Sequence, residues 1–130
     1  MKKILLAIVL TLFSAGAMAK WITVGKMEGD AGFTVYADKS SIKKAGNVSK
    51  MWALFDFNSI KKTKDFRYLS YKQLAEYDCQ GQKTRVMEYS LHSKHMGKSG
   101  AIFKDRTPGK WEKIVPKSVA GNLFEIACKK

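Results

Sequence analysis

The sequence predicts an α+β fold: a single antiparallel β-sheet of about six strands, with a C-terminal α-helix packed on one face and tied to it by a disulfide. Two observations support this prediction. Most of the chain after residue 20 alternates apolar and polar residues with a period of two, interrupted by short polar turns. The C-terminal residues instead have helical spacing, and the chain contains two cysteines, Cys79 and Cys128.

Residues 1–19 have the three parts of an export signal. Lys2 and Lys3 precede an apolar run over residues 4–13, and Ala-Met-Ala at residues 17–19 is a small-residue cleavage site. The apolar run is shorter than the roughly 20 residues that span a bilayer. We therefore expect a cleaved signal peptide and one mature domain over residues 20–130, without a transmembrane segment.

Export places the mature chain where thiols are oxidised, so Cys79 and Cys128 are expected to form a disulfide. Each cysteine lies at the end of an apolar element, one at the end of a strand and one in the C-terminal segment. The bond would close a loop of roughly 50 residues and stabilise the fold by about 4 kcal/mol in the chain-entropy model. The spacing is not Cys-x-x-Cys, which argues against a redox-active pair.

Three strands are expected in the first half of the mature domain. They are residues 21–26, residues 32–37 and residues 48–57, and the last has the clearest alternation. Polar or glycine-containing turns separate the strands at residues 28–30, 38–41 and 45–47.

The second half begins with a basic loop over residues 58–65. Two further strands, residues 66–79 and 84–93, flank a Gln-Gly-Gln turn and are expected to pair as a hairpin. Core packing accounts for most of the aromatic residues, although Trp52 and Tyr68 fall on the opposite faces of their strands. If that second face is uncovered, it is a candidate contact surface.

A C-terminal helix is expected to follow Pro116. Ser118 is a suitable N-cap, and Val119, Leu123 and Ile126 recur at helical spacing. A final strand over residues 123–128 is the alternative. The helix is favoured because it would cover the apolar side of the sheet.

The charge balance favours anionic partners. The whole chain has a formal net charge of +13, and without residues 1–19, which contain two lysines, it is 22 − 11 = +11. Such a field attracts polyanions such as lipopolysaccharide, acidic glycans or an anionic membrane surface. Nucleic acid is not an expected partner of the exported chain. The positive charges are spread along the sequence, so a solvated basic surface is the alternative.

The candidate binding residues form two groups of cations. Lys61, Lys62 and Lys64 lie within four residues, followed by Arg67, and the second group is Lys43 and Lys44. Loops on a rigid sheet commonly carry recognition. The alternative is that these lysines only make the loop soluble.

No catalytic, metal or cofactor site is expected. The acids occur singly, no nucleophile motif such as Gly-x-Ser-x-Gly is present, and both cysteines are assigned to the disulfide. His92 and His95 lack nearby ligands to complete a metal site and are expected to be surface histidines. The sequence therefore does not predict an enzyme.

Short motifs occur in a characteristic order along the mature chain. They are Trp21, Val-Tyr-Ala-Asp at 35–38, Met-Trp-Ala-Leu-Phe-Asp at 51–56, Glu-Tyr-Asp-Cys at 76–79, Trp111, Val-Pro-Lys-Ser at 115–118 and Cys128. In this order they resemble the bacterial surface-adhesin protein E family over nearly the whole mature chain. The resemblance implies an antiparallel sheet with a disulfide-tied C-terminal helix, and adhesion to matrix and plasma proteins of a host.

One feature departs from the family's lipoprotein pattern. Lys20, rather than a lipid-carrying cysteine, follows the expected cleavage site. We therefore expect a periplasmic or secreted protein, with display on the cell surface as a further option.

The expected function is that of an exported, non-enzymatic, adhesin-like binding protein that engages host or matrix proteins or another envelope partner. The alternative is a periplasmic binder of an anionic envelope component, or an inhibitor of an attacking enzyme. The partner is therefore a protein or a polyanionic ligand, and a homodimer is a further option.

Overall fold

The computed structural model describes residues 20–129, so the expected signal peptide lies outside the described residues. Within this span, seven strands, one short 3₁₀ turn (η1) and one α-helix follow one another. In chain order they are β1 (Trp21–Met27), β2 (Phe33–Ala45), β3 (Val48–Lys62), β4 (Arg67–Asp78), β5 (Lys83–His92), η1 (His95–Gly97), β6 (Ala101–Asp105), β7 (Glu112–Lys113) and α1 (Val119–Cys128).

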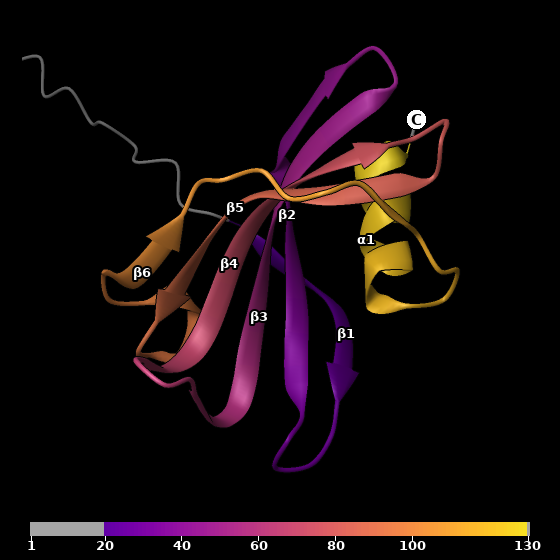
Figure 1. Ribbon diagram of the computed structural model, residues 1–130. Helices are drawn as coiled ribbons and strands as arrows, with labels where there is room; N and C mark the ends of the chain where they lie inside the picture. Colours follow the sequence, from indigo (N-terminus) through magenta and orange to yellow (C-terminus); the bar gives the residue numbers. More distant parts are fainter. Residues whose placement is uncertain (1–19, 130) are drawn as a thin grey trace, which may run out of the picture.

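The strands form one antiparallel sheet in the order β1-β2-β3-β4-β5-β6, and β7 pairs with β5. Neighbours along this order are also neighbours in the sequence, so the sheet is a meander whose backbone groups pair through short connections. Figure 1 shows the strongly twisted sheet, with α1 beside it and the β4–β5 hairpin reaching over the helix. The predicted fold class is confirmed.

The core lies between α1 and one face of the central strands. Because side chains alternate along a strand, every second residue in the middle of β2, β3 and β4 lies on the face that α1 packs against. Leu123 and Ala127 of α1 are buried against Val35, Ala37, Met51, Ala53, Ala75 and Tyr77.

A cap begins α1, and a disulfide and a hydrogen bond hold the helix on the sheet. Ser118 caps the helix, since its hydroxyl accepts a hydrogen bond from the Gly121 backbone N–H at 3.0 Å. The Cys79–Cys128 disulfide joins the end of β4 to the last turn of the helix, with 5.6 Å between the Cα atoms. The buried Ser49 hydroxyl on β3 donates to the Ala127 carbonyl at 2.7 Å. The helix is confirmed, and the alternative strand over residues 123–128 is excluded.

Two predicted interruptions of the sheet are wrong. The expected turn at residues 38–41 lies inside β2, where the pairing with β3 shifts between Asp38 and Lys43. The local turn chemistry exists, since the Asp38 carboxylate accepts from the Ser40 N–H at 3.0 Å, but it forms a bulge rather than ending the strand.

The expected basic loop over residues 58–65 is also mostly strand. β3 continues to Lys62 after a register shift that begins at Asp56, and only residues 63–66 turn the chain into β4. The polar composition of this stretch suggested a loop, but pairing with β4 satisfies its backbone groups. Strands β6 and β7 were not predicted individually, since each is short and flanked by polar residues.

Candidate functional site

The structure divides the predicted basic residues between the two ends of β3. Lys61 and Lys62 end β3, Lys64 lies in the turn, and Arg67 begins β4 opposite Lys62. We call these four residues the basic hairpin. All but the half-buried Lys61 are exposed, and Asp65 is the acid among them.

Lys43 and Lys44 lie near the opposite end of β3, opposite Lys50 and Ser49. Roughly 35 Å of extended chain separates Lys50 from Lys61 along that strand. The Lys44 ammonium donates to the Lys129 carbonyl just after α1, which gives this lysine a structural contact. The structure therefore does not bring the two groups of cations into one surface.

Eight aromatic side chains form a connected group across five strands and one turn. Adjacent ring centroids along the group are 5.0–6.2 Å apart, and the pairs are mostly tilted or edge-to-face, with Tyr71 and Tyr89 stacked. All eight side chains are half-buried. We call this group the aromatic belt: Phe33, Phe55, Phe57, Phe66, Tyr68, Tyr71, Tyr89 and Phe103.

The belt continues the apolar face on which α1 packs. Phe33 and Phe55 are partly buried against the core cluster, and the other rings extend from them. The ten residues of α1 measure about 15 Å, whereas the fifteen residues of β3 extend for about 50 Å. The helix is therefore too short to cover the whole face, which leaves the belt partly open to solvent.

Tyr68 is a correction to the sequence interpretation. Alternation along the strand placed it on the opposite face, together with Trp52. Its ring instead packs on Phe57 with 5.7 Å between centroids, next to the register shift between β3 and β4. Trp52 does lie on the other face.

The basic hairpin and the aromatic belt adjoin. The Lys61 ammonium lies 5.4 Å from the centroid of the Phe57 ring, within cation–π range. Near the centre of the belt, burial and the neighbouring Tyr89 and Tyr68 raise the pKa of Tyr71 to about 12. Tyr71 therefore stays an uncharged phenol, and its hydroxyl donates to the Gln73 side chain at 3.1 Å. The belt offers an apolar surface with cations at one end.

The opposite face of the sheet carries the two histidines, and the expectation that both lie at the surface is wrong for His92. That side chain is 5% exposed. Its Nδ1–H donates to the Ser99 carbonyl at 3.1 Å, and its Nε2 accepts from the Ser90 hydroxyl at 2.8 Å. His95 is exposed and lies 3.2 Å from the Asp56 carboxylate. Strand alternation places a residue on a face but does not reveal that β6 and its loop cover His92.

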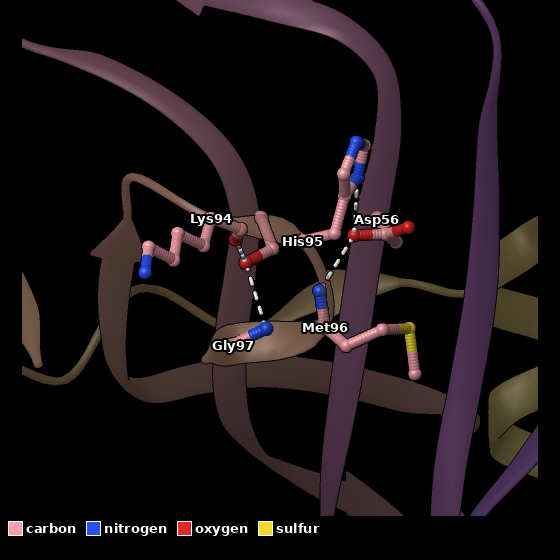
Figure 2. A network of polar contacts seen from close by, with 6 residues as sticks. Asp56, Lys94, His95, Met96 and Gly97 are labelled. Atoms are coloured by element: carbon pink, nitrogen blue, oxygen red, sulfur yellow. Dashed lines mark hydrogen bonds and ion pairs between the residues drawn. The ribbon is translucent and has the colours of Figure 1, made fainter. Parts of the chain in front are cut away.

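The loop between β5 and β6 is fixed onto β3 and β4, as Figure 2 shows. The Asp56 carboxylate accepts from the Met96 N–H at 2.8 Å, and the Ser70 hydroxyl accepts from the Gly97 N–H at 2.8 Å. Met96 and Gly97 both have a positive φ, which is unfavourable for methionine. These hydrogen bonds hold the loop in place and thereby position the residues that follow it.

Burial of His92 predicts a stability loss in acid. Burial lowers the pKa of His92 below its usual 6.5, and the nearby Lys72 and Lys104 lower it further, although the bond to Ser99 opposes this. As the pH falls through 6.5, the unfolded chain takes up a proton that the folded protein does not, so unfolding becomes more favourable. The free energy of unfolding, measured with urea at a series of pH values, should fall more steeply with decreasing pH for the wild type than for His92→Gln. If the two free energies fall in parallel, the prediction is wrong.

Metal ligands, free thiols and membrane-spanning helices are three further features that could indicate a function within residues 20–129. No group of three or more His, Cys, Asp or Glu side chains there could hold a metal ion. Both cysteines are in the disulfide. None of the helices in this span is long and apolar enough to cross a membrane.

The fold is an antiparallel meander with one helix packed on it and held by a disulfide, which makes this an α+β protein. The chain belongs to the surface-adhesin protein E family, whose model matches residues 21–129. Family membership makes it an adhesin-like surface protein and points to protein partners and a non-enzymatic role.

A solved structure agrees with the fold. The crystal form II structure of Haemophilus influenzae protein E superposes with a TM-score of 0.60 at 13% sequence identity, over 85% of this chain and 96% of that chain. At this identity the similarity establishes the architecture alone. No curated protein matches the sequence.

The sequence interpretation missed the aromatic belt as a surface. It identified the aromatic residues and the faces of most of them, but attributed them to core packing. The available signal was the length of the helix, since about three turns cannot cover a strand of fifteen residues.

Proposed function

We propose that this protein is an exported, non-enzymatic adhesin that binds a host or matrix protein through the aromatic belt. The belt is the observation that supports this proposal, because eight half-buried rings form one group that α1 leaves open. Membership of an adhesin family agrees with it. Binding a host or matrix protein requires that the exported protein reach the medium or the cell surface.

Partly exposed aromatic rings suit protein recognition. Tyrosine and phenylalanine are enriched at the cores of protein interfaces, where they provide large contact areas with few rotatable bonds. The rings here also pack against one another, so their side chains are already fixed in place before a partner binds. Binding through this surface would therefore cost the protein less conformational entropy than binding through a flexible loop.

The basic hairpin makes the surface favour a negatively charged partner. Its four cations outnumber Asp65, and Lys61 contacts the belt directly. Positive charge at the rim accelerates association with an acidic partner, and this effect weakens with salt. We therefore expect the partner to present apolar side chains next to acidic ones.

Binding to purified matrix and plasma proteins tests the proposal. Tyr68→Ala and Phe103→Ala remove rings from different parts of the belt. Each is expected to weaken binding by about 30-fold, the size of an interface hot spot of about 2 kcal/mol. Affinity is measured by biolayer interferometry against immobilised matrix proteins, and thermal unfolding confirms that each variant is folded.

Trp111→Ala is a matched control for this experiment. Trp111 is an exposed aromatic residue that lies outside the belt and stacks on Arg85. Its loss should leave binding unchanged. If Trp111→Ala weakens binding as much as the belt variants, or if the belt variants bind normally, the belt is not the binding surface.

The basic charge favours a second candidate, a binder of an anionic envelope component. Replacing Lys61, Lys62 and Lys64 together by Ser separates the two functions. A polyanion binder would lose affinity for heparin or lipopolysaccharide and would weaken steeply as salt rises. An adhesin that uses the belt would keep most of its affinity for its protein partner and mainly associate more slowly.

A further inference from the structure

A pocket of about 360 Å³ opens on the sheet face opposite α1. Trp52 lines it, and this residue alternates along β3 with Met51 and Ala53, which face the helix. The size falls near the lower end of the range for small-molecule sites, about 300–1,000 Å³. The rest of the aromatic belt lies on the other face, and Tyr89 is the one belt residue that also lines this pocket. The inference below does not rest on the function proposed above.

Two tryptophans and two lysines come together in the pocket from four different strands. Trp21 is on β1, Trp52 on β3, Lys72 on β4 and Lys104 on β6. Trp21 lies opposite Asp38 on β2, and Asp38 in turn lies opposite Trp52 on β3, so the same face carries both indoles. The pocket therefore combines aromatic surface with two ammonium groups, and its lining also includes the carboxylates of Asp38 and Glu88.

Neither lysine is neutralised within the described part of the chain. The ion pairs found in residues 20–129 do not include Lys72 or Lys104. Both ammonium groups are close enough to His92 to act on its charge. Ser90 pairs with Lys72 on β4 and with Lys104 on β6, so the two lysines flank it and their ammonium groups can share a single carboxylate.

The pocket also presents acceptors. The Ser90 hydroxyl donates its proton to His92 Nε2 at 2.8 Å, so its oxygen lone pairs remain available to a ligand. Glu88 lines the same pocket and lies 3.7 Å from Arg106. Hydroxyl groups of a ligand can donate to these oxygens.

We propose that this pocket binds a sugar acid, with its carboxylate between Lys72 and Lys104 and its ring against Trp21 and Trp52. The apolar C–H face of a sugar ring packs on an indole, while its hydroxyls donate to Ser90 and Glu88. The dianion of a phosphate monoester fits less well, because its phosphate group has no donor for these oxygens and its second negative charge adds to the repulsion from Glu88 and Asp38. A neutral sugar leaves both lysines without a partner.

The surrounding structure keeps the pocket in shape. His92 holds Ser90 and the Ser99 carbonyl, and Ser99 lines the pocket. The loop before Ser99 is held by Asp56 and Ser70, as described above. A site held in this way needs little rearrangement to bind.

NMR titration of the ¹⁵N-labelled mature protein with sodium glucuronate tests the proposal. We expect saturable shifts of the indole N–H signals of Trp21 and Trp52, while Trp111 stays unchanged. Lys104→Gln should weaken binding about tenfold, the effect of losing one charge-assisted hydrogen bond. Lys104 is exposed, so this variant is expected to fold.

Lys113→Gln is the matched control, since it removes the same charge from an exposed site on β7, outside the pocket. It should bind glucuronate like the wild type. The proposal is overturned if glucuronate causes no shifts, if glucose binds equally well, or if acetate reproduces the shifts. Methyl glucuronide shows whether the sugar acid is free or part of a glycan. If methyl glucuronide binds, the ligand is a terminal glycan residue. If glucuronate binds and methyl glucuronide does not, the ligand is the free sugar acid.

Discussion

Removing the Cys79–Cys128 disulfide is expected to lower the free energy of unfolding by about 4 kcal/mol. The bond joins residues 49 positions apart, so it restricts the unfolded chain far more than a short loop would. This loss is a large part of the 5–15 kcal/mol that is typical of a small domain. Urea unfolding of the Cys79→Ala/Cys128→Ala variant, followed by circular dichroism, measures it.

Reduction of the wild-type protein provides an independent measurement. The reduced protein should unfold at a urea concentration close to that of the double variant, and the variant itself should not respond to reductant. A double variant as stable as the oxidised wild type would show that the disulfide contributes nothing to the fold. Intact-mass analysis after alkylation without reductant checks that the starting protein carries no free thiol.

The parts of the fold that were predicted correctly rest on local signals. Ser118 can cap a helix whatever surrounds it, and the spacing of Val119 and Leu123 defines one helical face. Alternation over β3 likewise needs no knowledge of its neighbours. Predictions from such local signals are correct where the tertiary structure favours the same conformation.

The wrong predictions occur where pairing overrides local preference. Asp38 and Ser40 make the hydrogen bond of a turn, yet the flanking residues of β2 pair with β3, so the strand bulges and continues. Lys61 and Lys62 have the polar character of a loop, yet they pair with Tyr68 and Arg67. A polar residue costs little on a strand when its side chain reaches solvent.

The two candidate sites depend on contacts that sequence alternation does not contain. The aromatic belt requires the helix to end before the apolar face does, and the pocket requires strands as distant as β1 and β6 to curve toward each other. Trp21 and Lys104 are far apart in the sequence, and no spacing rule connects them. Their juxtaposition follows from the twist of the meander.

Leu123→Ala is expected to destabilise the protein by about 3 kcal/mol, because it deletes a side chain that is 1% exposed at the centre of the helix–sheet contact. Alanine favours helix at least as well as leucine, so the loss measures packing alone. The neighbouring Asn122 is exposed, and Asn122→Ala should change stability by under about 0.5 kcal/mol. Equal effects of the two substitutions would contradict the observed packing of α1.

Combining Leu123→Ala with the loss of the disulfide tests whether the helix behaves as a separate unit. A ten-residue helix is marginal on its own, so without the Cys79–Cys128 bond its attachment depends on packing and on the Ser49–Ala127 hydrogen bond. Removing Leu123 then releases the helix before the sheet unfolds. The combined loss of unfolding free energy should be smaller than the sum of the two separate losses. The urea m-value should be lower than that of the disulfide-free variant that keeps Leu123, because the folded state then buries less surface. Additive losses with an unchanged m-value would mean that the helix and sheet unfold together.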